Sequence, residues 1–216
     1  MQAGLLLLVG AIIMLSFLML TQTRIINLVK LLVAQNIILT SYLLDKSIIY
    51  PSMELYISLS ITFIIKVIIL PYLLWKLTNY LHLSYRIEPL LKKSTLLLSA
   101  ILLVIFAIML CHQLEPIIGQ APIIGFSLAL ANSLLAVLLI IFRRKSISQV
   151  IGLLVLENSI FLLSTTLTRG LPWLVELGMS FDVLLGFMIF GLFLLRIQSS
   201  YGSLNIFYLE KMRERK

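Results

Sequence analysis

The chain has 216 residues, of which 61% are hydrophobic and only 12% are charged, whereas soluble domains carry about a quarter charged residues. A mean hydropathy of +1.10 leaves too few polar side chains to cover a water-facing surface. The composition therefore indicates an integral membrane protein. One cysteine, Cys111, excludes an internal disulfide and a thiolate-held metal cluster.

Polar or Pro/Gly breaks divide the chain into seven predicted transmembrane helices, each of about 20 residues. In chain order they cover about 3–21, 25–44, 55–76, 94–112, 121–142, 147–168 and 173–196. Continuous apolar runs favour helices over the alternating strands of a membrane β-barrel. We expect the first stretch to be a retained helix and not a signal peptide, because no Lys or Arg precedes Arg24. In the third span, Pro71 is expected to kink the helix and to free the carbonyl of Val67.

The basic residues predict how these helices are oriented. Thirteen of the 17 Lys and Arg residues fall on one predicted side of the membrane, whereas Lys46 and Arg169 are alone on the other side. This positive-inside asymmetry places the N-terminus outside and the C-terminus in the cytoplasm, which requires an odd number of spans. It also accounts for the net charge of +8 without a nucleic-acid partner. The tail at 199–216 is expected to form an interfacial helix, to bind a cytoplasmic partner or to fray.

A repeated segment predicts the domain organisation. Residues 30–36 read KLLVAQN and residues 152–158 read GLLVLEN, at an offset of 122 positions. We interpret the chain as two three-helix repeats, over 1–82 and 121–198. A loop and one spacer helix over 83–120 join them, and this single extra span makes the two repeats parallel.

Four ionisable side chains stand out well inside the predicted spans, where a charge costs about 2.5–3.5 kcal/mol and is by default a functional candidate. The acids Glu157 and Asp182 belong to the second repeat, and the bases Lys30 and Lys66 to the first. Buried acids and bases are the components of a proton relay, because burial brings the pKa of both kinds of group closer to neutral pH. The alternative is a set of static ion pairs, such as Glu157 with Lys66, that locks helices together.

Amide side chains accompany these charges. Gln35 and Asn36 in the first repeat correspond to Glu157 and Asn158 in the second. Such amides either hydrate an ion path or form hydrogen bonds between helices. The two histidines lie near predicted helix ends and lack neighbouring ligands, so we expect neither a metal site nor a cofactor in this chain.

Three segments carry a resemblance to a known family: residues 144–162, residues 170–184, and residues 61–66 followed by Leu70 and Pro71. These segments and the chain length resemble the hydrogenase-4 component E family, and the resemblance covers essentially the whole chain. That family is a duplicated relative of the NuoK subunit of respiratory complex I and of the C subunit of Mrp sodium/proton antiporters.

The resemblance implies an accessory membrane-arm subunit of a group 4 NiFe-hydrogenase complex, such as a formate hydrogenlyase, or of a related redox complex in the cytoplasmic membrane. Such a subunit is not catalytic alone. Its partners would be antiporter-like subunits, a membrane anchor subunit and hydrogenase-type subunits, and the NiFe centre and iron–sulfur clusters would lie in those partners.

NuoK-type modules carry membrane-embedded glutamates on their second and third helices, which by resemblance assigns Glu157 and Asp182 to an ion path. The first repeat departs from that pattern, with Gln35 and Lys66 in the related helices. A purely structural subunit and an Mrp-type antiporter subunit remain alternatives. Against a self-contained transporter stands the parallel, rather than inverted, repeat.

Overall fold

The computed structural model describes residues 2–49, 51, 53–80, 91–118 and 123–167, together with Gly186 and Gly191. Within these residues, six helices are long and apolar enough to cross a membrane. This finding agrees with the predicted helical, multi-pass membrane protein. The seventh predicted span at 173–196 and the tail at 199–216 lie outside the described residues.

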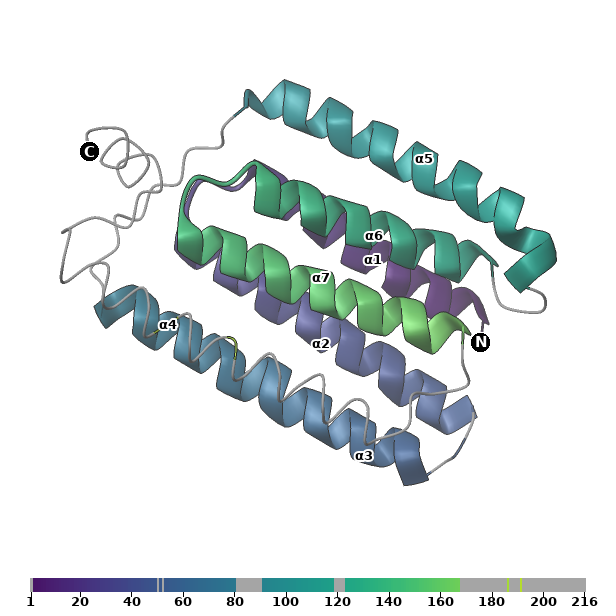
Figure 1. Cartoon of the computed structure of the whole chain (residues 1–216). Helices are drawn as coiled ribbons and strands as arrows, with labels where there is room; N and C mark the ends of the chain where they lie inside the picture. The colour runs from purple at the N-terminus through teal and green to yellow at the C-terminus, as the bar shows by residue number, and fades with distance from the viewer. Residues whose placement is uncertain are drawn as a thin grey trace.

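The helices are α1 (Gln2–Thr21), α2 (Ile25–Ile49), α3 (Met53–Thr62), the π-helix η1 (Phe63–Ile69), α4 (Leu70–Tyr80), α5 (Lys93–Ile118), α6 (Ile123–Ile141) and α7 (Ser146–Leu167). Successive long helices run in opposite directions, while α4 and α5 lie on opposite sides of the bundle (Figure 1). The elements α3, η1 and α4 are continuous in sequence and form one rod. The helices α1 and α6 run in the same direction, and α2 and α7 run in the opposite one.

The helices α6 and α7 pack against each other, and they lie beside α1 and α2 respectively. The helix α5 packs on α6 and α1, whereas the rod packs on α2 from another side. Lipid is as apolar as leucine, so close packing and interhelical hydrogen bonds, and not the removal of apolar surface from water, hold such helices together.

The buried apolar residues form two clusters along the length of the helices. On α2 the first cluster ends at Leu32 and the second begins at Leu39, and on α7 the corresponding residues are Val155 and Phe161. The buried polar residues between these limits are Gln35, Asn36, Glu157, Asn158 and Ser159. A polar layer therefore separates two apolar halves of the core, about midway along the helices.

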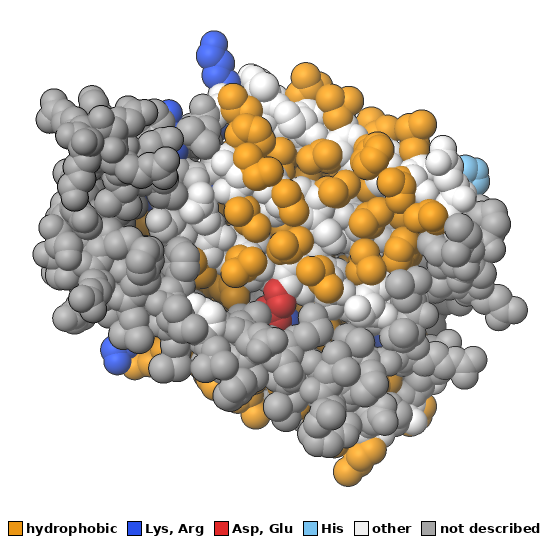
Figure 2. All heavy atoms as spheres, in the orientation of Figure 1, with side chains coloured by type: hydrophobic (Ala, Val, Ile, Leu, Met, Phe, Trp, Pro, Cys, Tyr) orange, Lys and Arg blue, Asp and Glu red, His pale blue; other side chains and the backbone are white. Residues whose placement is uncertain are grey.

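Large apolar side chains also cover the outside of the bundle (Figure 2). The predicted spacer, α5, shows this most clearly: Leu98, Leu102 and Met109 are 60%, 59% and 62% exposed. Such a surface suits contact with lipid. Lys and Arg side chains gather mainly at the end where α4 ends and α5 begins (Figure 2). This distribution follows the predicted charge asymmetry, while the side of the membrane on which that end lies stays a prediction.

The helix α2 extends beyond its predicted end at residue 44 as far as Ile49. Lys46, which was expected to mark a loop, is instead buried, and its Nζ donates a hydrogen bond to the carbonyl of Thr165 near the end of α7. A cation at the C-terminal end of a helix meets unpaired carbonyls and the negative end of the helix dipole. The neighbouring helix thus satisfies Lys46, and α2 continues through it.

The disturbance expected at Pro71 is present, but in a different hydrogen-bond register. The chain forms a seven-residue π-helix just before Pro71, and the N–H of Leu70 donates to the carbonyl of Ile65. In an α-helix that N–H would bond the carbonyl of Lys66. The carbonyl of Lys66 receives a side-chain donor from another helix, while the free carbonyl expected at Val67 stays a prediction.

Candidate functional site

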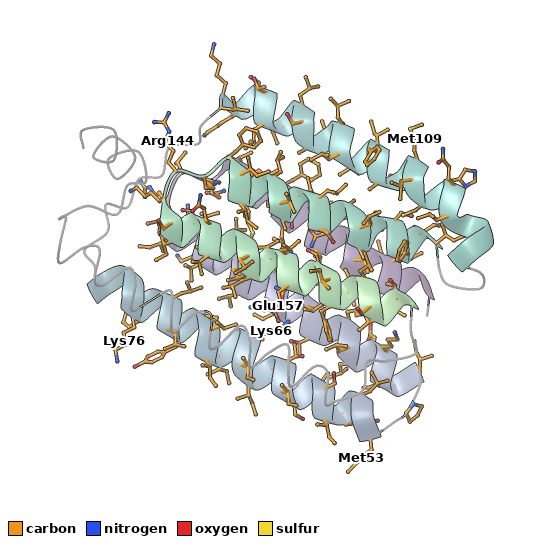
Figure 3. The ribbon with its side chains drawn as sticks, in the orientation of Figure 1. Met53, Lys66, Lys76, Met109, Arg144 and Glu157 are labelled. Atoms are coloured by element: carbon orange, nitrogen blue, oxygen red, sulfur yellow. The ribbon has the colours of Figure 1, made fainter. Side chains whose placement is uncertain are left out.

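A buried ion pair lies at the centre of the molecule. Lys66 Nζ of η1 is 2.8 Å from Oε1 of Glu157 on α7, and the two side chains are only 3% and 9% exposed. Figure 3 shows both residues pointing toward each other between α7 and the rod. Each lies about midway along a helix that is long enough to cross the membrane. The pairing of Glu157 with Lys66, one of the alternatives open at the level of sequence, is the arrangement present in the structure.

Two asparagines close a ring of hydrogen bonds around Lys66. Lys66 Nζ donates to Oδ1 of Asn158 at 3.2 Å, and Nδ2 of Asn158 donates to Oδ1 of Asn36 at 2.6 Å. Nδ2 of Asn36 in turn donates to the backbone carbonyl of Lys66 at 2.6 Å. The ring joins η1, α7 and α2. It holds both the ammonium and the backbone of the same lysine.

An aromatic face completes the surroundings of the ammonium. Lys66 Nζ lies 5.0 Å from the ring centroid of Phe161, which is within the range of a cation–π interaction. Phe161 follows Glu157 by four residues, so the two side chains lie on the same face of α7. One face of α7 thus supplies both a negative charge and an electron-rich ring to the lysine.

The carboxylate of Glu157 is less well satisfied than the ammonium. Its Oε2 is buried and has no hydrogen-bond partner among the described residues, and Oε1 contacts Lys66 as an ion pair without an aligned hydrogen bond. Burial of two charges is repaid only when further hydrogen bonds satisfy both groups. Among the described residues, the carboxylate is thus the half of the pair with fewer hydrogen-bond partners.

A second polar chain crosses the bundle beside this cluster. Nε2 of Gln35 donates to Oγ of Ser16 at 3.1 Å, and that hydroxyl donates to Oδ1 of Asn132 at 2.6 Å. Nδ2 of Asn132 then donates to Oγ of Ser159 at 2.6 Å. The chain connects α2, α1, α6 and α7 through neutral groups. Oε1 of Gln35 is buried, and no described residue donates a hydrogen bond to it.

The structure brings together three of the six predicted site residues: Lys66, Glu157 and Asn158. Gln35 belongs to the adjacent neutral chain, and Lys30 is exposed on α2 and takes part in none of the contacts described above. Asp182 lies outside the described residues.

Sequence reasoning missed Ser16, Asn132, Ser159 and Phe161. The available signal was a single asparagine inside the apolar span 121–142, whereas Ser16 and Phe161 are ordinary residues in membrane helices and carry none. Within the described part of the chain, no three His, Cys, Asp or Glu side chains are grouped so that they could hold a metal ion.

Comparison with known proteins gives two kinds of relative. Over 174 residues the chain is 24% identical to hydrogenase-4 component E of Escherichia coli K12, and this alignment covers 80% of each of the two proteins. The Shigella flexneri protein of the same name gives the same values. The chain is thus distantly similar to hydrogenase-4 component E.

An uncharacterized protein of Mycobacterium tuberculosis is 31% identical over 124 residues. That alignment covers 56% of this chain and 54% of the relative, so it spans about half of each protein. No protein-family model and no solved structure match the chain. The expected resemblance to hydrogenase-4 component E is therefore supported at the level of a distant similarity, and the duplicated NuoK-like organisation stays a prediction.

Proposed function

We propose that the protein is a membrane subunit of a hydrogenase-type redox complex, in which the Lys66–Glu157 pair takes part in proton translocation coupled to electron transfer. The observation that carries the proposal is the buried ion pair midway along two membrane helices, with one carboxylate oxygen that has no partner within the described part of the chain. The similarity to hydrogenase-4 component E over four-fifths of the chain supports the type of complex.

The chemistry of the pair suits proton movement. A proton that reaches Glu157 neutralises the carboxylate and leaves the Lys66 ammonium without its counter-charge. In a medium of low dielectric constant that loss is costly, so it favours either release of a proton from Lys66 or a shift of the ammonium toward another acceptor. A change of charge in a neighbouring subunit would act on the pair in the same way, since charges in the membrane interior are weakly screened.

The surroundings of the chain follow from the same proposal. The protein would lie in the cytoplasmic membrane beside antiporter-like subunits and a membrane anchor subunit, and hydrogenase-type subunits would carry the NiFe centre and iron–sulfur clusters. Asp182 and the neutral chain that begins at Gln35 are candidates to extend the proton path. This chain would bind no redox cofactor of its own.

Affinity purification of the native complex, followed by measurement of protons moved per electron, tests the proposal. We expect hydrogenase-type and antiporter-like subunits to copurify, and we expect Glu157→Gln to lower proton coupling by at least tenfold while the complex still assembles. Asp45→Asn is the matched control, because it also removes one carboxylate but from an exposed position on α2. Its coupling should equal that of the unmodified complex.

Different outcomes favour different alternatives. If Glu157→Gln assembles and couples normally, the ion pair holds helices together and the subunit is structural, a function that the closed ring of hydrogen bonds around Lys66 would also serve. Copurification with antiporter subunits alone would indicate an Mrp-type antiporter subunit. An active transporter purified without partners would contradict both the redox complex and the structural role.

A further inference from the structure

We infer that Asn36 is a positioning residue: it holds the backbone of Lys66 in a π-helical register and so keeps the ammonium opposite Glu157. This inference rests on the proposed function for its consequence in proton coupling, but its structural basis is independent of that function. Asn36 touches no proton-carrying atom. It acts through the carbonyl of Lys66 and through the side chain of Asn158.

The backbone carbonyl of Lys66 has no backbone donor in the register that the chain adopts. In an α-helix the carbonyl of Lys66 would accept from the N–H of Leu70, but that N–H donates to Ile65. In a π-helix the donor to residue i is residue i+5, which for Lys66 is Pro71. Proline has no N–H. Neither helical register therefore supplies a donor to this carbonyl as the chain is folded.

Asn36 supplies the missing donor from α2, through Nδ2 at 2.6 Å. An unpaired carbonyl in the membrane interior costs several kcal/mol, so this bond stabilises the π-helical register against the α-helical one. In the α-helical register the N–H of Leu70 would donate to the carbonyl of Lys66. That register is shorter by one residue per hydrogen bond, so the residues before Leu70 would rotate about the helix axis by about 100° relative to those after it. Lys66 would then turn away from Glu157.

The same asparagine also couples the backbone of Lys66 to its ammonium. Oδ1 of Asn36 accepts from Asn158, and Oδ1 of Asn158 accepts from Lys66 Nζ. The Asn36 amide is 2% exposed and the Asn158 amide is 3% exposed, so water does not readily replace either bond. A correct backbone register and a correctly placed ammonium thus depend on each other.

The sequence allows a direct measurement of this carbonyl. Lys66–Val67 is the only Lys–Val step in the chain. Labelling with carbonyl-13C lysine and 15N valine therefore marks one peptide bond, and solid-state NMR of the full chain in lipid bilayers reports its carbonyl shift. In Asn36→Leu we expect that shift to change, because the carbonyl loses its side-chain donor and is left either unpaired or bonded to the N–H of Leu70 in the α-helical register.

A second-site change distinguishes positioning from general stability. Pro71→Ala restores an N–H that can reach the carbonyl of Lys66, so Asn36→Leu combined with Pro71→Ala should recover most of the shift and part of the proton coupling that Asn36→Leu loses. Asn132→Leu is the matched control, since Asn132 is a similarly buried asparagine whose side chain bonds Ser16 and Ser159 and not Lys66. In Asn132→Leu the Lys66 carbonyl shift should equal that of the unmodified protein, and adding Pro71→Ala should have the same effect on it as in the unmodified protein.

Two results overturn the inference: an unchanged Lys66 carbonyl shift in Asn36→Leu, or an equal change in Asn132→Leu. If Asn36→Leu does not fold, Asn36→Ser gives the same measurement, because its shorter side chain does not reach the carbonyl. A shift that moves and recovers, with proton coupling unaffected throughout, supports the positioning of Lys66 and contradicts the proposed proton pathway instead. The two proposals therefore fail in distinguishable ways.

Discussion

The Lys66–Glu157 pair combines a well-satisfied cation with a poorly satisfied anion. Lys66 has Glu157, Asn158 and Phe161 around its ammonium, whereas one oxygen of Glu157 contacts no donor in the residues that the structure describes. The contribution of the pair to the free energy of folding depends on whether one charge or both are removed. Removal of one member of a buried pair leaves an uncompensated charge and costs about 3–5 kcal/mol, while replacement of both by apolar residues is often neutral.

A double-mutant cycle on this pair tests that reasoning. We expect Lys66→Met and Glu157→Leu each to destabilise the protein by about 3 kcal/mol, and the double variant to be close to the unmodified protein. The free energy of unfolding in detergent micelles provides the measurement. Additive single effects would show that the two charges do not interact energetically, in spite of their 2.8 Å separation.

The ends of the helices are joined across the bundle by buried cations. Arg143 follows α6 and is only 2% exposed. Its guanidinium donates to the carbonyls of Gln22, Met19 and Leu20 at the end of α1, at 2.7, 2.5 and 3.1 Å. Burial lowers the pKa of Arg143 to about 10, so it stays charged at neutral pH. At the opposite end of the helices, Lys46 of α2 plays the corresponding part for α7.

Loss of the Arg143 side chain should therefore loosen the α1 end. We expect Arg143→Met to lower the free energy of unfolding by about 2–4 kcal/mol, because three carbonyls lose a charged donor. Arg24→Met removes the same charge from an exposed position at the start of α2 and should change stability by less than about 0.5 kcal/mol. Chemical denaturation of both variants in the same detergent compares them, and equal losses would show that net charge, not capping, matters.

For the whole molecule, the offset of 122 residues has a counterpart in three dimensions. Asn36 and Asn158, which the offset pairs, are joined by a hydrogen bond. The same shift carries α1 approximately onto α6 and α2 onto α7, and each helix packs beside its counterpart and runs in the same direction. These contacts suit two parallel repeats that face each other across the polar layer. The duplication itself stays a prediction, because the third helix of the second repeat lies outside the described residues.

The predicted topology can be tested with reporter fusions. A fusion that follows residue 170, after α7, should place the reporter outside the cytoplasm, and a fusion to residue 216 should place it inside. The reason is that one further span, 173–196, separates these two points, and most Lys and Arg residues mark the inner side. Alkaline phosphatase activity paired with fluorescence of a cytoplasmic reporter measures both. The same location for the two fusions would exclude the seventh span.

Several features of this protein follow from its sequence alone. Unbroken apolar runs determine membrane helices, because backbone groups in lipid must bond within their own segment. The cost of a buried charge singles out Glu157 and Lys66 for the same reason. Pro71 likewise predicts a disturbed helix, since proline lacks a backbone N–H in any surroundings.

Tertiary structure alone decided which groups meet. The helices are apolar on all sides, so their sequences do not encode the rotation that turns Lys66 toward Glu157 and leaves Lys30 exposed. The register at Pro71 depended on a donor from another helix, Asn36, which bonds the carbonyl of Lys66. From the sequence, Arg143 is expected to be a charged residue in a loop, and only the position of α1 beside it provides the carbonyls that its guanidinium bonds. Each outcome depends on contacts between segments far apart in the chain, and such contacts arise only when the bundle is packed.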